Sequence, residues 1–122
     1  MATITEDYVS FETAKLLKEK GFDKYPLFPC YKEDNGEFID IPTTLDTINY
    51  YFISAPTLQM AMKWLREVHN LQIQIAPIIS GHKNWTFGID RDFSPLTIKL
   101  LCLPTYEDAA EAAIKYCLEN LI

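Results

Sequence analysis

The side chains best suited to carry chemistry lie in the stretch from residue 80 to residue 92. Ser80 places its hydroxyl two residues from the His82 imidazole, and a hydroxyl beside a base is what nucleophilic catalysis requires. Asp90 and Asp92 flank Arg91, and paired carboxylates can exchange protons or hold a cation. No nucleophile elbow or Cys-His signature surrounds the serine. Arg91 is expected to neutralise the two carboxylates, so this stretch predicts no catalytic residue.

Metal ligands and phosphate-binding loops also lack a recognisable pattern. His69 and His82 are far apart in the sequence, and neither belongs to an H-E-x-x-H motif. The four glycines are scattered, so they form no glycine-rich phosphate loop. The three cysteines contain no C-x-x-C pair and are expected to be reduced, buried thiols: Cys30, Cys102 and Cys117. We therefore expect no metal site and no cofactor.

Length and charge restrict the class of protein. A chain of 122 residues with 48% hydrophobic residues is the size of one globular domain, so a single domain over 1–122 is expected. Eleven Lys and Arg against seventeen Asp and Glu give a net charge of −6, which disfavours nucleic acid as a partner. No export signal or long apolar segment is visible. These observations predict a cytoplasmic protein that does not enter a membrane.

Cap and stop signals mark three helices. A Ser or Thr before each helix can accept the first free amides, and a Gly or Asn after it can adopt the left-handed conformation that ends a helix. The expected helices are about 11–20 with Ser10 and Gly21, about 57–69 with an opening at 54–57 and Asn70 as the stop, and about 106–120 with Thr105 as the cap.

Alternating and β-branched segments mark the strands. Segments 27–31 and 37–41 are expected to form a hairpin through Asn35 and Gly36, with Pro29 favouring an edge strand or a bulge. Segment 49–53 is either a further strand or an extended connection. Segments 71–75, which Pro77 ends or bends, and 85–90 are expected to form a second antiparallel pair around a turn at 80–84. A further strand is expected at 96–103, after a loop at 91–95.

Together these segments predict an α+β fold. Its three helices would lie on one face of a mainly antiparallel sheet of four to five strands, in the order α-β-β-α-β-β-β-α.

The central helix has more apolar surface than one sheet contact needs. Its predicted buried face is formed by Leu58, Ala61, Met62, Leu65 and Val68. Met60 and Trp64 lie on the margin and widen the apolar arc. A partner protein could cover this margin, or the first helix or segment 50–53 could cover it within the monomer. The residues that we consider interface candidates are Met60, Trp64, Tyr50 and Tyr51.

Three helical segments carry a resemblance. Segments 8–22 (YVSFETAKLLKEKGF), 55–69 (APTLQMAMKWLREVH) and 106–120 (YEDAAEAAIKYCLEN) resemble small uncharacterised proteins carried by phages and prophages of Bacteroides-type gut bacteria. The resemblance implies a phage-related or mobile-element origin and a cytoplasmic setting. It supplies no catalytic residues.

The leading hypothesis is therefore a small, non-catalytic accessory protein that acts through protein–protein association, with itself or with another protein. An alternative is a small-ligand-binding or minor enzymatic domain. Its pocket would lie between the sheet and the central helix and would use His82, Asp90 or Asp92. A third hypothesis, a nucleic-acid mimic, requires the acidic side chains to form one contiguous surface.

Overall fold

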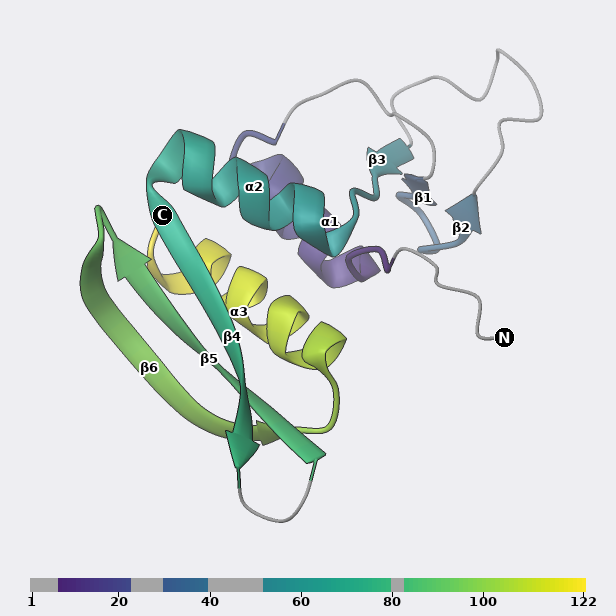
Figure 1. Ribbon diagram of the computed structural model, residues 1–122. Helices are drawn as coiled ribbons and strands as arrows, with labels where there is room; N and C mark the ends of the chain where they lie inside the picture. The colour runs from purple at the N-terminus through teal and green to yellow at the C-terminus, as the bar shows by residue number, and fades with distance from the viewer. Residues whose placement is uncertain (1–6, 23–29, 40–51, 80–82) are drawn as a thin grey trace. The chain divides into compact units, whose positions relative to one another are not determined.

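Two units make up the chain, Met1–Thr57 (unit 1) and Leu58–Ile122 (unit 2). The computed structural model describes residues 7–22, 30–39, 52–79 and 83–122 (Figure 1). Within these residues, three helices and six strands confirm the α+β class and, with one additional short strand, the predicted order. The strands form two three-stranded antiparallel sheets, one in each unit, where one sheet was expected. The single domain over 1–122 remains a prediction.

Helix α1 (Phe11–Glu19) of unit 1 begins and ends as its local sequence predicts. The Thr13 amide donates to the Ser10 hydroxyl at 3.3 Å. At the other end, Gly21 has a φ of 101°, and the Phe22 amide donates to the Leu17 carbonyl at 2.9 Å. This is the Schellman ending, which requires a left-handed residue that glycine adopts without a Cβ clash.

The sheet of unit 1 has the strand order β2-β1-β3. Its strands are β1 (Cys30–Lys32), β2 (Phe38–Ile39) and β3 (Phe52–Ser54). The predicted hairpin is confirmed, because β1 pairs with β2 around a turn that contains Gly36. Of the two alternatives expected from Pro29, the edge strand is wrong for the described part of this segment, because β1 lies between the other two strands. Its described residues begin after Pro29, so each of them has an amide to donate. The other alternative, a bulge at Pro29, lies outside the described residues.

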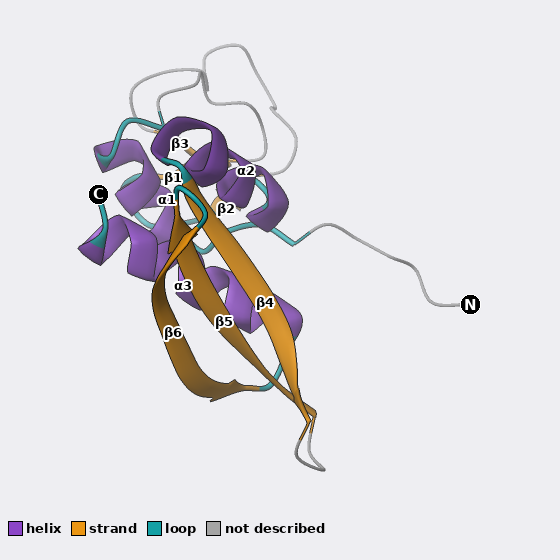
Figure 2. Ribbon diagram, turned by 60° about the vertical axis from the view of Figure 1, so that its left-hand side comes forward, coloured by secondary structure: helices purple, strands orange, loops and turns teal. Residues whose placement is uncertain are grey.

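Unit 2 packs two helices on one three-stranded sheet. The strands β4 (Leu71–Ile79), β5 (Lys83–Arg91) and β6 (Ser94–Leu103) follow one another in space as in sequence. Helix α3 (Tyr106–Asn120) contacts all three strands, and α2 (Leu58–His69) contacts α3 and β4 (Figures 1 and 2). The predicted cap of α3 is confirmed, because the Asp108 amide donates to the Thr105 hydroxyl at 3.0 Å. Helix α2 ends at His69, followed by Asn70 at a φ of 55°.

Small and large side chains interlock in the core of unit 2. Ala109, Ala110 and Ala113 of α3 are fully buried, and their small size lets the helix axis approach the sheet closely. From the sheet, Phe87 and Ile89 of β5 fill the facing layer. The Phe87 ring contacts the Tyr116 ring with 6.5 Å between the centroids.

Two points of the prediction for unit 2 are corrected. Of the two effects expected of Pro77, ending or bending the strand, the first is wrong, because β4 continues to Ile79. Because β4 is an edge strand, a residue without an amide donor can be accommodated there. The expected loop at 91–95 is a turn of only two residues, Asp92 and Phe93, with φ values of 50° and 64°. Two successive left-handed residues are typical of the type I′ turn that matches the strand twist.

Candidate functional site

Helix α2 buries only part of the face that its periodicity predicts. The buried members of this face are Leu58, Ala61, Met62 and Leu65, whereas Val68 is 57% exposed. Met60, which was expected on the margin, is 52% exposed. Burial is centred on the side that meets β4 and α3, and Val68 lies at the edge of that side. The placement of Val68 in the core was therefore wrong. Met60, Trp64 and Val68 follow one another at four-residue spacing and form an apolar stripe along the outer side of α2.

Trp64 is partly covered by its own helix. Its ring meets the His69 ring edge-on, with 4.7 Å between the centroids. The Nε2 atom of His69 is buried and has no hydrogen-bond partner in the part of the chain that the structure describes. The imidazole therefore packs against the indole. As a result, α2 exposes less apolar surface around Trp64 than the sequence indicated.

The turn between β5 and β6 is attached to the connection between α2 and β4. The Asp92 amide donates a hydrogen bond to the Asn70 carbonyl at 3.1 Å, and the Phe93 amide donates one to Gln72 Oε1 at 3.3 Å. The Phe93 side chain is 87% exposed. A large aromatic ring is therefore fixed by backbone contacts in a position where water surrounds it.

Arg91 joins the end of α3 to the same place. It was expected to neutralise Asp90 and Asp92, but its guanidinium donates to the Leu121 carbonyl. This contact satisfies a carbonyl that the helix itself leaves without a partner. The end of α2, the β5–β6 turn and the C-terminus consequently meet at one end of unit 2 (Figure 1).

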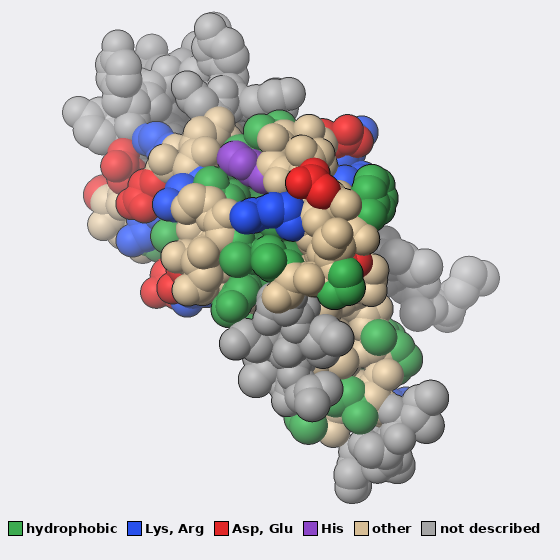
Figure 3. Space-filling view, turned by 90° about the vertical axis from the view of Figure 1, so that its left-hand side faces the viewer, with side chains coloured by type: hydrophobic (Ala, Val, Ile, Leu, Met, Phe, Trp, Pro, Cys, Tyr) green, Lys and Arg blue, Asp and Glu red, His purple; other side chains and the backbone are tan. Residues whose placement is uncertain are grey.

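Four exposed apolar side chains lie in or next to the segments that meet here, and we call them the apolar end: Val68, Phe93, Leu96 and Ile122. Figure 3 views the molecule from this side, where hydrophobic side chains are exposed among Lys, Arg and other polar groups. Sequence reasoning missed Phe93, because a phenylalanine in an expected five-residue loop could still fold back onto the core. In a turn of only two residues, the Phe93 side chain cannot fold back onto the core.

The alternative pocket residues are not brought together by the described structure. His82 lies outside the described residues, as do Tyr50 and Tyr51 of the interface set. Asp90 accepts a hydrogen bond from Gln74 Nε2 at 2.7 Å and stands opposite Gln72 in the ladder. Because neighbouring residues of a strand point to opposite faces, Asp90 points away from the face that buries Ile89. It therefore does not face the space between the sheet and α2.

The three cysteines differ in exposure. Cys30 and Cys117 are buried, and burial raises the pKa of both thiols, that of Cys117 to about 12. Cys102 is exposed, so the expectation of three buried thiols is corrected for this one. Among the described residues, no three His, Cys, Asp or Glu side chains are arranged to hold a metal ion.

This difference predicts the order in which the thiols react. In the native protein, Cys102 should react with an aromatic disulfide reagent in a fast phase of one equivalent, because the reagent can reach only this exposed thiol. Absorbance of the released thiolate measures the stoichiometry. Cys102→Ser should remove the fast phase. The wild-type protein should react with three equivalents after unfolding in urea. A fast phase that persists in Cys102→Ser would contradict the burial of the other two thiols.

No helix within the described residues is both long enough and apolar enough to cross a bilayer. Comparison with protein-family models, with curated proteins and with solved structures yields no match to this chain.

Proposed function

We propose that this protein functions by binding another protein through the apolar end of unit 2, and not by catalysis. The observation that carries the proposal is Phe93, an aromatic residue that is left-handed and 87% exposed at the same time. The left-handed conformation costs roughly 1–2 kcal/mol for a residue with a Cβ. Because the ring is exposed, it buries little apolar surface that could offset this strain. A strained, exposed aromatic side chain is better explained by a binding role than by a contribution to folding.

The surroundings of Phe93 suit an interface. Val68 extends the apolar surface from α2, while the charged Arg91 is exposed at its border. An apolar centre with charged groups at the rim is the usual composition of protein–protein interfaces. The proposal also takes over the cytoplasmic setting and the phage or mobile-element origin that the helical segments imply by resemblance.

Phe93→Gly should weaken association while it stabilises the fold. Glycine relieves the left-handed strain, so the free energy of unfolding should rise by about 1 kcal/mol. Loss of an aromatic anchor should weaken binding tenfold or more, since such anchors contribute about 2 kcal/mol or more. Urea unfolding measures the first effect. Sedimentation velocity and affinity capture from the cytosol of a Bacteroides-type bacterium, each compared with the wild-type protein, measure the second.

Asp92→Gly is the matched control. It removes the neighbouring left-handed side chain in the same turn and leaves the ring in place. A protein captured by the wild type and by Asp92→Gly, and lost by Phe93→Gly, would support the proposal. Equal self-association and equal capture by Phe93→Gly and the wild type would contradict it, because the glycine variant keeps its fold.

A further inference from the structure

Unit 1 contains a series of aromatic side chains that the sequence patterns did not indicate as a site. The ring centroids of Tyr8 and Phe38 are 5.5 Å apart, those of Phe38 and Tyr31 are 5.4 Å apart, and those of Tyr31 and Phe11 are 5.6 Å apart. We call these four residues the aromatic ladder. They come from the segment before α1, from α1, and from both strands of the β1–β2 hairpin.

Backbone contacts hold the ladder in place. The Tyr31 hydroxyl donates to the Val9 carbonyl, and the Val9 amide donates to the Pro56 carbonyl at 3.0 Å. At the other side, Gly36 lies so close to Phe11 that a Cβ at this glycine would be 2.7 Å from the ring. The rings are therefore preorganised, which reduces the entropy that binding would otherwise cost.

Two members of the ladder are open to solvent. Phe38 is 42% exposed and Tyr8 is 37% exposed, and their rings are in contact. The faces of aromatic rings carry partial negative charge and attract cations. The Phe11 ring of the ladder already binds a cation within this chain, because the Lys15 ammonium lies 4.8 Å from its centroid.

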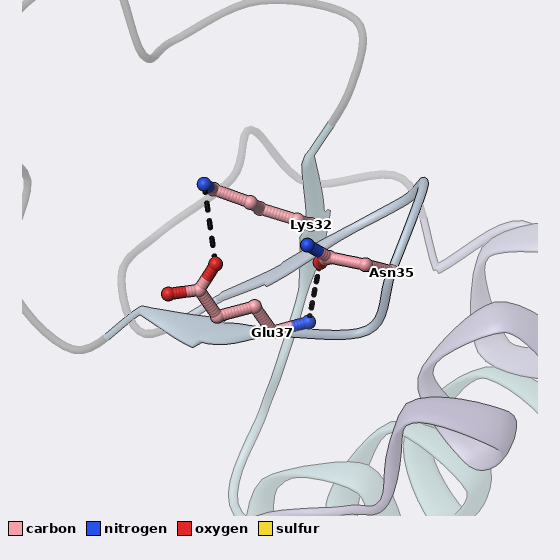
Figure 4. A network of polar contacts seen from close by, with 3 residues as sticks. All are labelled: Lys32, Asn35 and Glu37. Carbon is pink, nitrogen blue, oxygen red and sulfur yellow. Dashed lines mark hydrogen bonds and ion pairs between the residues drawn. The ribbon is translucent and has the colours of Figure 1, made fainter.

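Carboxylates surround the same hairpin. Glu33, Asp34 and Glu37 lie in or beside its loop, and all three are exposed. The nearby ammonium of Lys32 is paired with Glu37 at 3.2 Å, and the Asn35 side chain accepts from the Glu37 amide at 2.9 Å (Figure 4). This pairing offsets the only cation of region 30–39. It leaves the negative charges of Glu33 and Asp34 exposed in the turn that joins the two strands carrying Tyr31 and Phe38.

We propose that the aromatic ladder and the acidic hairpin loop bind an arginine-bearing segment of a partner protein. A guanidinium is flat, so it can stack on Tyr8 or Phe38, and its N–H groups can donate to a carboxylate at the same time. An ammonium stacks less well, and a nucleic acid would place its phosphates against the carboxylates of the loop. This surface belongs to unit 1 and is independent of the apolar end.

The test uses a fluorescein-labelled peptide of alternating arginine and glycine, with fluorescence anisotropy of the full chain as the readout. Phe38→Leu keeps an apolar side chain in β2 and removes the ring, and it should weaken binding about fivefold. Phe38→Tyr should restore the affinity. Glu33→Gln combined with Asp34→Asn should also weaken binding several-fold and reduce its dependence on salt. Phe93→Gly should leave binding unchanged, which separates this surface from the apolar end.

Three outcomes would overturn the proposal. The first is equal affinity for the matching lysine–glycine peptide, which would show attraction by net charge alone. The second is unchanged binding by Phe38→Leu with circular dichroism like that of the wild type. The third is tighter binding of a single-stranded oligonucleotide than of the arginine peptide.

Discussion

Phe87→Ala should lower the free energy of unfolding of unit 2 by about 3–5 kcal/mol. Phe87 lies in the middle of β5, is only 2% exposed, and packs against Tyr116 of α3. Truncation removes the apolar surface that the ring buries. It also leaves a cavity, because the hydrogen-bonded strands on both sides of β5 limit how far the structure can collapse.

Tryptophan fluorescence in urea measures this effect in unit 2 alone. The chain has two tryptophans, Trp64 and Trp85, and both belong to unit 2. The matched control is Phe93→Ala, which makes the same substitution in the same hairpin at an exposed position and should change stability by about 0.5 kcal/mol or less. If both variants unfolded at the same urea concentration, the packing of α3 on β5 would be refuted.

Unit 2 should lose stability steeply above pH 9 because of Cys117. Burial raises the pKa of this thiol from 9.0 to about 12, with a smaller opposing effect of the Arg91 charge. The unfolded chain then releases the proton at a lower pH than the folded chain does. The stability contributed by the neutral thiol is therefore complete below pH 9 and is lost as the pH rises toward 12. Over this range the loss amounts to about 4 kcal/mol.

The comparison of wild type with Cys117→Ala isolates this contribution. Lysine and tyrosine side chains titrate in the same range, but their effects are common to both proteins and cancel in the difference. The urea midpoint of unfolding is measured by tryptophan fluorescence at about pH 8, 9, 10 and 11, which spans the start of the thiol titration at about pH 9. With rising pH, the midpoint should fall more steeply for the wild type than for Cys117→Ala. Parallel pH profiles would mean that the Cys117 thiol is not desolvated in the folded protein.

The helices could be predicted from the sequence because their limits depend on neighbouring residues. The Ser10 cap and the Gly21 stop of α1 act through hydrogen bonds that span three to five residues. Asn70 ends α2 through its left-handed φ of 55°, and the Thr105 hydroxyl caps the start of α3. Such contacts form whatever the rest of the chain does, so a local pattern is sufficient to locate them.

Strand pairing was predictable only where a turn joins the two strands. The Asn35-Gly36 turn predicted the β1–β2 hairpin, and the alternation in 71–75 and 85–90 predicted the β4–β5 pair. The pairing of β1 with β3 was not apparent, because a long stretch of chain separates Lys32 from Phe52. The division into two sheets has the same origin, since a period of two defines the faces of a strand but not its neighbours.

By itself the sequence determined the α+β class, the helix limits and the lack of any reactive motif, because each of these depends on residue type and short spacing. Only the tertiary structure decided which apolar side chains are exposed. Periodicity placed Val68 in the core and could not distinguish Phe93 from a core residue, whereas both are exposed. The tertiary structure also brings Tyr8, Tyr31 and Phe38 into contact. The physical reason is that hydrophobicity is a property of one residue, whereas burial depends on which distant segments pack against it.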